Sequence, residues 1–352
     1  MKTIHFKLSI LFFLSFFVFG FGFQQQSKKV YRELEVNSDV TVEIENQFGA
    51  LTISSWDQNQ VVIEVQITVK GTNEKRLKEK LDAIDIDFSL SPEFISARTV
   101  IDEGWGFGWF NSSKLKYQID YLVKLPKTAA IDIENNYGSI VINALEGKAK
   151  IRCDYGSLLI GELFHIDNYL SFDYTSNSSI DYIKGGTIHA DYSDFEVSEA
   201  VAVKLKADYT KSKFKTVKDL EFRNDYGKLT IEQINQLRGK GDFLTLRVAQ
   251  LFKTIDLNQE FGSIKVEYVN PSVTDITIDS EYTGINLILD QDWDFTYTIN
   301  LEFANLKSNL PLQHQIQKEG STEKNYKGYL FKKSSSHRLQ IDSEFGTVKL
   351  NH

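Results

Sequence analysis

Carboxylates recur at one position of a repeated sequence pattern, directly before an aromatic residue. The set is Asp154, Asp173, Asp191, Asp208, Asp225, Asp242, Glu260, Glu281, Glu302 and Glu344. If the copies stack, these side chains form a row with a spacing of ~5 Å. Hard cations such as calcium bind several carboxylates at once, so the row is a candidate cation ladder. Its least compensated part is Asp279, Glu281, Asp342 and Glu344, where a cation is expected first.

Basic residues give the row a second interpretation. Upstream and downstream of the carboxylates lie Arg152, His189, Lys206, Arg223, Lys240, Lys213, Arg247, Lys265, Lys307 and Lys349. These cations can neutralise the acids, and Asp also hydrogen-bonds its own turn. Since the sequence contains no consensus calcium loop, we predict a structural charge ladder with no metal and no other cofactor.

Catalysis has little support in the sequence. The histidines are scattered, at His5, His165, His189, His314, His337 and His352. No Ser/His/Asp spacing, HExxH motif, zinc-ligand cluster or phosphate loop is present in the sequence. Some β-helical proteins cleave acidic polysaccharides with carboxylate-bound calcium and a basic residue, which leaves that activity as an alternative. We predict that the protein is not an enzyme.

An aromatic cluster in EGWGFGWFNSS, residues 103–113, is the one residue-level binding site that the sequence predicts. Trp105, Phe107, Trp109 and Phe110 lie among glycines between two predicted strands, as at a hairpin tip. An exposed cluster of this kind would contact a protein partner, a glycan or a membrane surface. In the alternative interpretation the tip folds back and is buried.

The repeated unit is clearest in Ile131–Ile142, IDIENNYGSIVI. Ile131, Ile133, Asn135 and Tyr137 alternate onto one face, as in a half-buried strand. At Gly138 the alternation slips by one residue, which predicts a bend there, because glycine can adopt a positive φ. This pattern places the corner aromatic on the inward face, in an aromatic core stack. An exposed stacking platform for sugar rings is the alternative.

The corner recurs along the chain, at Phe48, Tyr137, Tyr155, Tyr174, Tyr192, Tyr209, Tyr226, Phe243, Phe261, Tyr282, Phe303 and Phe345. From Tyr137 to Phe303 the steps are seventeen to twenty-one residues. The gap from Phe303 to Phe345 is two such steps, with Tyr326 as a degraded corner inside it. A short period with one bent strand pair per copy is typical of a solenoid. Two residues before the corner lies an inward position, where the single cysteine, Cys153, is expected as a small buried side chain rather than a reactive thiol.

These patterns predict an all-β fold, a right-handed parallel β-solenoid with an N-terminal α+β cap. Residues 23–127 hold a first strand unit and the cap, and residues 128–352 hold the solenoid repeats. Within the cap, Asn73 is expected to begin a short helix with Leu77, Leu81 and Ile84 on one face. The polar segment Gln313–Tyr329 is expected to be a projecting loop.

Residues 1–22 have the pattern of a signal peptide. Lys2 and Lys7 precede the apolar run Leu8–Phe19, and Gly20-Phe21-Gly22 supplies small residues for cleavage, although an uncleaved anchor is the alternative. We therefore expect an exported protein, in the periplasm, on the outer surface or extracellular. No later apolar run is long enough to cross a bilayer. The net charge of −8 argues against nucleic acid as a partner.

The signal peptide, the [Asn/Asp]-[Tyr/Phe]-Gly corners and the alternating Ile/Val after them resemble the putative-adhesin families of Bacteroidetes-type bacterial envelope proteins. The resemblance covers nearly the whole mature chain, and glycine is absent from the corner at Thr175, Ser193, Thr210, Leu244, Thr283 and Ala304. It implies a secreted β-solenoid that presents a surface for adhesion or protein assembly, with an envelope protein or glycan as partner. The alternatives are a glycan-binding or polysaccharide-degrading β-helix protein and a periplasmic sensor partner.

Overall fold

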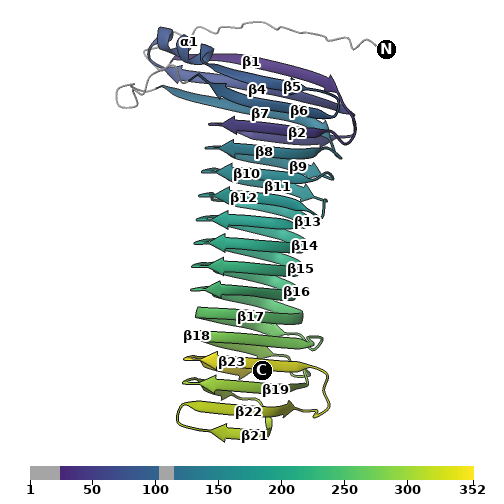
Figure 1. The fold of residues 1–352 in the computed structure, drawn as a ribbon, viewed down its shortest axis with the longest axis vertical. Helices are drawn as coiled ribbons and strands as arrows, with labels where there is room; N and C mark the ends of the chain where they lie inside the picture. Colours follow the sequence, from purple (N-terminus) through teal and green to yellow (C-terminus); the bar gives the residue numbers. More distant parts are fainter. Residues whose placement is uncertain (1–23, 103–114) are drawn as a thin grey trace. The chain divides into compact units, whose positions relative to one another are not determined.

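The computed structural model describes residues 24–102 and 115–352, and this part of the chain is nearly all β, with mostly parallel pairing (Figure 1). α1 (Glu74–Asp82) is the only helix in those two ranges. The chain divides into two compact units, Met1–Gly147 and Lys148–His352. The predicted boundary at residue 127 stays a prediction.

The first unit combines parallel and antiparallel pairing. Its strands are β1 (Gln24–Glu35), β2 (Thr41–Gln47), β3 (Leu51–Trp56), β4 (Gln60–Gly71), β5 (Ile84–Leu90), β6 (Phe94–Ile101), β7 (Lys116–Pro126), β8 (Ala130–Asn136) and β9 (Ser139–Leu145). One series runs β1–β4–β7 antiparallel and continues through β3 to β9 in parallel. The other runs β5–β6 antiparallel and continues through β2 to β8 in parallel. The sequence did not predict β1, because its alternation is carried by polar residues.

The predicted helix is confirmed. The Asn73 side chain accepts a hydrogen bond from the Arg76 N–H, which satisfies one donor of the first turn. Leu77 and Leu81 lie on one face and are buried, as the spacing indicated, but Ile84 is not part of this face because the helix ends at Asp82 and Ile84 begins β5.

The second unit is built from strands that pair in parallel at a short sequence offset. They are β10 (Ala149–Asp154), β11 (Ser157–Leu163), β12 (Asn168–Asp173), β13 (Ser178–Asp191), β14 (Asp194–Asp208), β15 (Lys211–Asp225), β16 (Lys228–Asp242), β17 (Thr245–Val269), β18 (Asp275–Leu289), β19 (Phe295–Glu302), β20 (Asn305–Ser308), β21 (Gln313–Glu319), β22 (Glu323–Leu330), β23 (Arg338–Glu344) and β24 (Thr347–Asn351).

The register superposes equivalent positions of successive copies. Ile188 pairs with Leu205, and Leu205 pairs with Phe222, so apolar residues stack on apolar residues in the interior. Asp191, Asp208 and Asp225 align in the same way. Figure 1 shows β13 to β16 lying one above the next. Each side chain therefore has its counterpart about one strand spacing away, ~4.8 Å.

The last copies do not follow chain order. β23 pairs in parallel with β18 on one side and with β19 on the other. Ser343 thus lies opposite both Ser280 and Leu301. The gap from Phe303 to Phe345 is therefore not two further steps: the chain leaves after β20 and returns to fill a place between β18 and β19.

Two predictions for this excursion are wrong. Gln313–Tyr329 is not a loop, because β21 and β22 form an antiparallel hairpin whose second strand pairs with β19. Tyr326 is not a corner: it lies within β22, and burial, followed by the hydrogen bond to Glu319, raises its pKa to about 12. Every side chain of β21 is exposed, so its sequence is polar except at Ile316 and lacks the apolar alternation of a half-buried strand. This polar composition is why the sequence suggested a loop.

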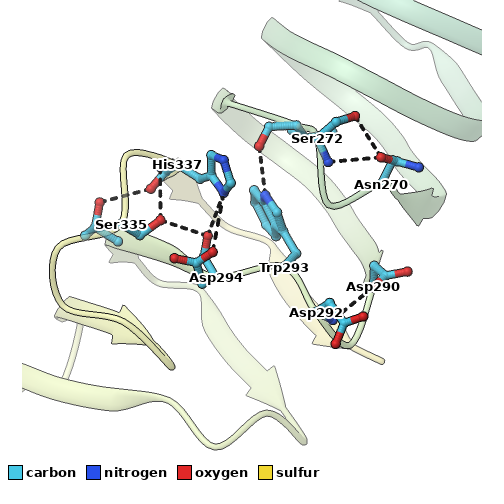
Figure 2. A network of polar contacts seen from close by, with 10 residues as sticks. Asn270, Ser272, Asp290, Asp292, Trp293, Asp294, Ser335 and His337 are labelled. Atoms are coloured by element: carbon cyan, nitrogen blue, oxygen red, sulfur yellow. Dashed lines mark hydrogen bonds and ion pairs between the residues drawn. The ribbon is translucent and has the colours of Figure 1, made fainter.

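Two turns lie beside the buried Trp293, one between β17 and β18 and one between β18 and β19 (Figure 2). Trp293 is fully buried, and its indole N–H donates to the Val273 carbonyl over 2.8 Å. Its ring stacks on Phe295 at 4.4 Å between centroids. Asp290 accepts the Asp292 N–H and Asn270 accepts the Ser272 N–H, so each turn is held by its own side chain.

Candidate functional site: an exposed aromatic ladder

The corner residue that adopts a left-handed backbone is the aromatic, not the glycine. The φ values are +58° at Tyr137 and +52° at Tyr209, and all twelve corner aromatics named above lie between +47° and +63°. The predicted bend at Gly138 is therefore wrong by one residue. Left-handed φ is strained for a side chain other than glycine, so its recurrence at every corner marks a feature that the surroundings enforce.

This backbone turns the aromatic side chain outward. Tyr209 is 52% exposed and Phe261 is 40% exposed, whereas Thr210 at the next position is fully buried. The prediction of an inward-facing aromatic core stack is wrong, because the alternation shifts at the aromatic itself. The inward position two residues earlier is confirmed as buried, for example at Ala207 and Cys153.

The outward rings of the second unit form one continuous stack, which we call the aromatic ladder. In spatial order its members are Tyr155, Tyr174, Tyr192, Tyr209, Tyr226, Phe243, Phe261, Tyr282, Phe345 and Phe303. Neighbouring centroids are 4.6–5.0 Å apart and the ring planes agree within 9°. The predicted alignment of the corners is thus confirmed.

Stacking decides which part of each ring a ligand can reach. Because neighbouring rings are nearly parallel, the faces of an interior ring such as Tyr209 are covered by Tyr192 and Tyr226. The half of the side chain that stays exposed is its edge. Sugar rings and cations bind aromatic faces, so the interior of the ladder is unsuited to either contact. It offers an apolar strip of ring edges instead.

Behind each ring, the residue two positions before the aromatic and the residue directly after it fill the same buried space. Where the inward residue is an amide, as at Asn135 and Gln259, the residue after the aromatic is glycine; a Cβ at Gly262 would lie 2.2 Å from the Leu244 carbonyl oxygen. Where the inward residue is alanine, the glycine is replaced by a hydroxyl residue: Thr210 Oγ1 donates to the Ala190 carbonyl. The corner conformation is therefore the same with or without glycine.

The carboxylate row beside the ladder is confirmed as a row by the register, since Asp173, Asp191 and Asp208 lie on adjacent paired strands. Asp173 Oδ1 accepts the Asp191 N–H over 3.2 Å, and Asp191 Oδ1 accepts the Asp208 N–H over 3.0 Å. Burial raises the pKa of Asp173 and of Asp208, and neighbouring aspartates raise both further. The row therefore carries electrostatic strain that its hydrogen bonds only partly offset.

The basic rows offset this strain in part, because the charges of His189 and Arg223 lower the pKa values of Asp173 and Asp208, respectively. Arg223 Nε lies 3.6 Å from Asp225 Oδ2, but other cations pair with glutamates away from the row. Lys213 and Lys215 contact Glu196, at 3.1 and 2.5 Å. Arg247 and Lys265 contact Glu267, at 2.8 and 2.6 Å.

Within residues 24–102 and 115–352, no group of three or more His, Cys, Asp or Glu side chains is placed to hold a metal ion. At the predicted cation position, Asp342 instead accepts hydrogen bonds from Asn300 over 2.6 Å and from Gln340 over 3.1 Å.

Ser335, His337 and Asp294 form a serine–histidine–aspartate cluster that sequence spacing did not indicate (Figure 2). The Ser335 hydroxyl donates to the Asp294 carbonyl and accepts the His337 backbone N–H. His337 Nδ1 lies 2.9 Å from the same carbonyl oxygen and 3.8 Å from the Asp294 carboxylate. A nucleophilic serine needs a hydrogen bond to the imidazole, whereas this hydroxyl is engaged with the backbone. The cluster holds a turn.

A shallow groove of about 460 Å³ crosses the strands of the second unit away from the ladder. Four of its charged lining residues pair across adjacent strands: Lys204 with Glu221 at 3.5 Å and Arg238 with Asp256 at 3.1 Å. Asp219 also lines the groove, and its Oδ1 is buried without a hydrogen-bond partner. A polysaccharide-cleaving groove would need exposed aromatic faces, and none of the described lining residues is aromatic.

The remaining predicted residues have separate outcomes. Cys153 is buried, and burial is the main reason that the pKa of its thiol rises to about 12, which keeps it protonated and unreactive. Trp105, Phe107, Trp109 and Phe110 lie outside the described residues, so the contact site there stays a prediction. At nine residues α1 is too short to cross a bilayer, and the described ranges hold no helix that could.

Comparison with known proteins gives structural likenesses only. No family model and no curated protein matches the chain. A "putative adhesin" from Parabacteroides distasonis has 11% identity and a TM-score of 0.39, over 74% of this chain and 97% of that one. A "putative lipid binding protein" from the same species has 12% identity and a TM-score of 0.35, over 74% and 96%. A "putative cell adhesion protein" from Clostridium sporogenes has 12% identity and a TM-score of 0.21, over 93% and 99%. At these scores the likenesses carry no argument about function.

Proposed function

We propose that the protein is an exported, non-enzymatic, right-handed β-solenoid that presents a surface for adhesion or protein assembly in the cell envelope. The observation that supports this proposal is the aromatic ladder: ten rings, each 40–53% exposed, in one unbroken strip. Monomeric soluble proteins rarely expose apolar side chains in a continuous patch unless the patch contacts something. Right-handed crossovers are the expected sense for parallel strands, and the signal-peptide pattern of residues 1–22 supports export.

The absence of enzymatic activity is part of the proposal. The paired charges of the groove and the backbone-bound Ser335 hydroxyl support it. The covered ring faces also speak against the glycan-binding alternative, because a sugar would have only edges to contact.

The test replaces ladder rings without disturbing the left-handed corners. Tyr192→Asn, Tyr226→Asn and Phe261→Asn are combined in one variant, since asparagine tolerates positive φ. The matched control is Leu159→Ser, Phe164→Ser and Ile166→Ser, which removes exposed apolar side chains of the same unit outside the ladder. Both variants and the wild type are cross-linked to the envelope surface of the source cells, and captured proteins are identified and rebound in purified form.

We expect the ladder variant to lose a purified partner that the control retains, with both variants folded by circular dichroism. Equal binding by the ladder variant and the wild type would refute the proposal.

A further inference from the structure

The aromatic ladder has two chemically different halves. The tyrosine half comprises Tyr155, Tyr174, Tyr192, Tyr209 and Tyr226. The phenylalanine half comprises Phe243, Phe261, Tyr282, Phe345 and Phe303. The phenylalanine half lacks most of the hydroxyl groups and is the more apolar of the two.

The charges beside the ladder change one ring further on, after Phe243. At the position two residues before the carboxylate, Lys206, Arg223 and Lys240 are aligned across strands and run from Tyr209 to Phe243, after His189 and Ser171 beside the earlier rings. Beyond Phe243 the same aligned position is held by Asn258, Asp279, Asp342 and Asn300. The flank thus turns from balanced to acidic.

The four glutamates of the phenylalanine half, which follow Asp242 in the row, are unengaged. Glu260, Glu281, Glu344 and Glu302 lie on successive paired strands. Across residues 24–102 and 115–352, their side chains find no hydrogen-bond or ion-pair partner. All but the half-buried Glu281 are exposed. Like charges at this spacing repel one another, so a cationic partner would relieve a repulsion that the protein leaves uncompensated.

On the opposite flank, two residues after each ring, the cations are Lys211 and Lys228. They align with Asp194 on one side and with Thr245 on the other. The equivalent positions further on are Ser263, Gly284, Thr347 and Asn305. Lys265, Lys307 and Lys349 lie two residues farther from the rings, beyond this neutral strip, and Lys265 is paired with Glu267. The phenylalanine half is therefore an apolar strip with acidic groups along one side and neutral groups along the other.

The geometry points to a docking surface for a lysine- or arginine-rich protein segment that carries apolar side chains between its charges. This inference rests on the proposed function and names the chemistry of its partner. Carboxylates repel nucleic acid and anionic lipid, while the covered ring faces exclude sugar stacking and cation–π contacts. Apolar side chains would lie against the ring edges, and the cations would reach Glu260, Glu281, Glu344 and Glu302.

The experiment measures direct binding of defined probes to the full mature chain. The probes are three fluorescein-labelled peptides of equal length, alternating Lys-Tyr, Glu-Tyr and Lys-Ser, followed by fluorescence anisotropy. Zwitterionic lipid vesicles serve as a further probe. The test variant is Glu260→Gln, Glu281→Gln, Glu302→Gln and Glu344→Gln. The matched control is Asp173→Asn, Asp191→Asn, Asp208→Asn and Asp225→Asn, which removes the same charge beside the tyrosine half.

We expect the Lys-Tyr peptide to bind, and the glutamine variant to bind it about tenfold more weakly, with a much smaller change in the control variant. Salt of about 0.5 M should weaken binding because the charges are exposed. Equal losses in both variants would show unspecific charge attraction and overturn the inference. So would preferential binding of vesicles or of the Glu-Tyr peptide, or self-association of the chain that the glutamine variant abolishes. If the purified partner's binding depends on the rings but not on these glutamates, the proposed function stands and this inference fails.

Discussion

At the scale of single residues, the carboxylate row is a source of instability that the fold tolerates. Asp173 and Asp208 have raised pKa values, first because they are partly buried and also because aspartates flank them. A group whose pKa is higher in the folded than in the unfolded state favours folding when protonated. Its contribution is therefore most favourable at low pH and is lost as the pH rises through the folded pKa.

The combined variant Asp173→Asn and Asp208→Asn should consequently be more stable than the wild type at pH 7. Asparagine keeps the acceptor that binds the Asp191 N–H and removes the charge. Because both side chains are partly solvated, we expect a gain below about 1 kcal/mol, which shrinks as the pH falls toward 4. Thermal unfolding at both pH values measures it.

Glu196→Gln provides a control of opposite sign. Hydrogen bonds from Lys215, and then from Lys213, lower the pKa of Glu196, so its ionised form stabilises the fold above the unfolded pKa. This variant should be less stable at pH 7 and approach the wild type at low pH. If the Asp173→Asn and Asp208→Asn variant were also less stable than the wild type at pH 7, the electrostatic strain in the carboxylate row would be disproved.

At the scale of the strand–corner–strand element, the sequence predicted the strands, the register and the stacking of corners, but not the direction of the rings. Alternation in Ile131–Asn135 extends to Tyr137 by pattern alone, and only the left-handed φ at Tyr137 sends its ring outward. The missing glycines at Thr210 and Leu244 suggested irregular corners. Their compensation lies three residues earlier, in the buried residues Ala207 and Gly241, and it becomes recognisable only once the corner shows that both positions face the interior.

This compensation predicts coupling between Gly241 and Leu244. A Cβ at Gly241 would lie 2.7 Å from Leu244 Cδ2, so Gly241→Ala should destabilise the protein by overpacking, by about 1–3 kcal/mol. Leu244→Thr alone should leave a cavity and cost about 2 kcal/mol or more. The double variant recreates the Ala207–Thr210 pair, and its loss should fall short of the sum by about 1 kcal/mol or more. Guanidinium unfolding of the four proteins gives the coupling energy, and strict additivity would contradict shared volume.

At the scale of the whole second unit, spatial order departs from chain order. Equal corner spacing predicted that β19 follows β18 directly, and no local signal in the sequence marks the later strand that separates them. The pairing of Ser343 with both Ser280 and Leu301 is a property of the assembled strands alone. The antiparallel β21–β22 hairpin could not be predicted from the sequence either. β21 is an edge strand with every side chain exposed, so it has no alternation of apolar and polar residues.

A disulfide test distinguishes the two orders. In a Cys153→Ala background, Ser280→Cys with Ser343→Cys should form a bridge, because adjacent paired strands place Cα atoms within the ~4.4–6.8 Å that a disulfide requires. Ser280→Cys with Leu301→Cys should not, because these residues lie two strands apart, about 10 Å. Electrophoresis without reductant and mass spectrometry of linked peptides report the result. A bridge in the second pair alone would restore sequential order.

The placement of β23 also bears on how the chain reaches its native state. During synthesis β19 emerges before β23. The unpaired edge of β18 is therefore exposed first to β19, which has the same strand pattern as β23 but is not its neighbour in the final structure. Reaching the final arrangement requires β19 to remain unattached, or to detach and move outward by one strand when β23 arrives. A slow late phase in refolding, confined to residues after β18, is the kinetic signature of that exchange.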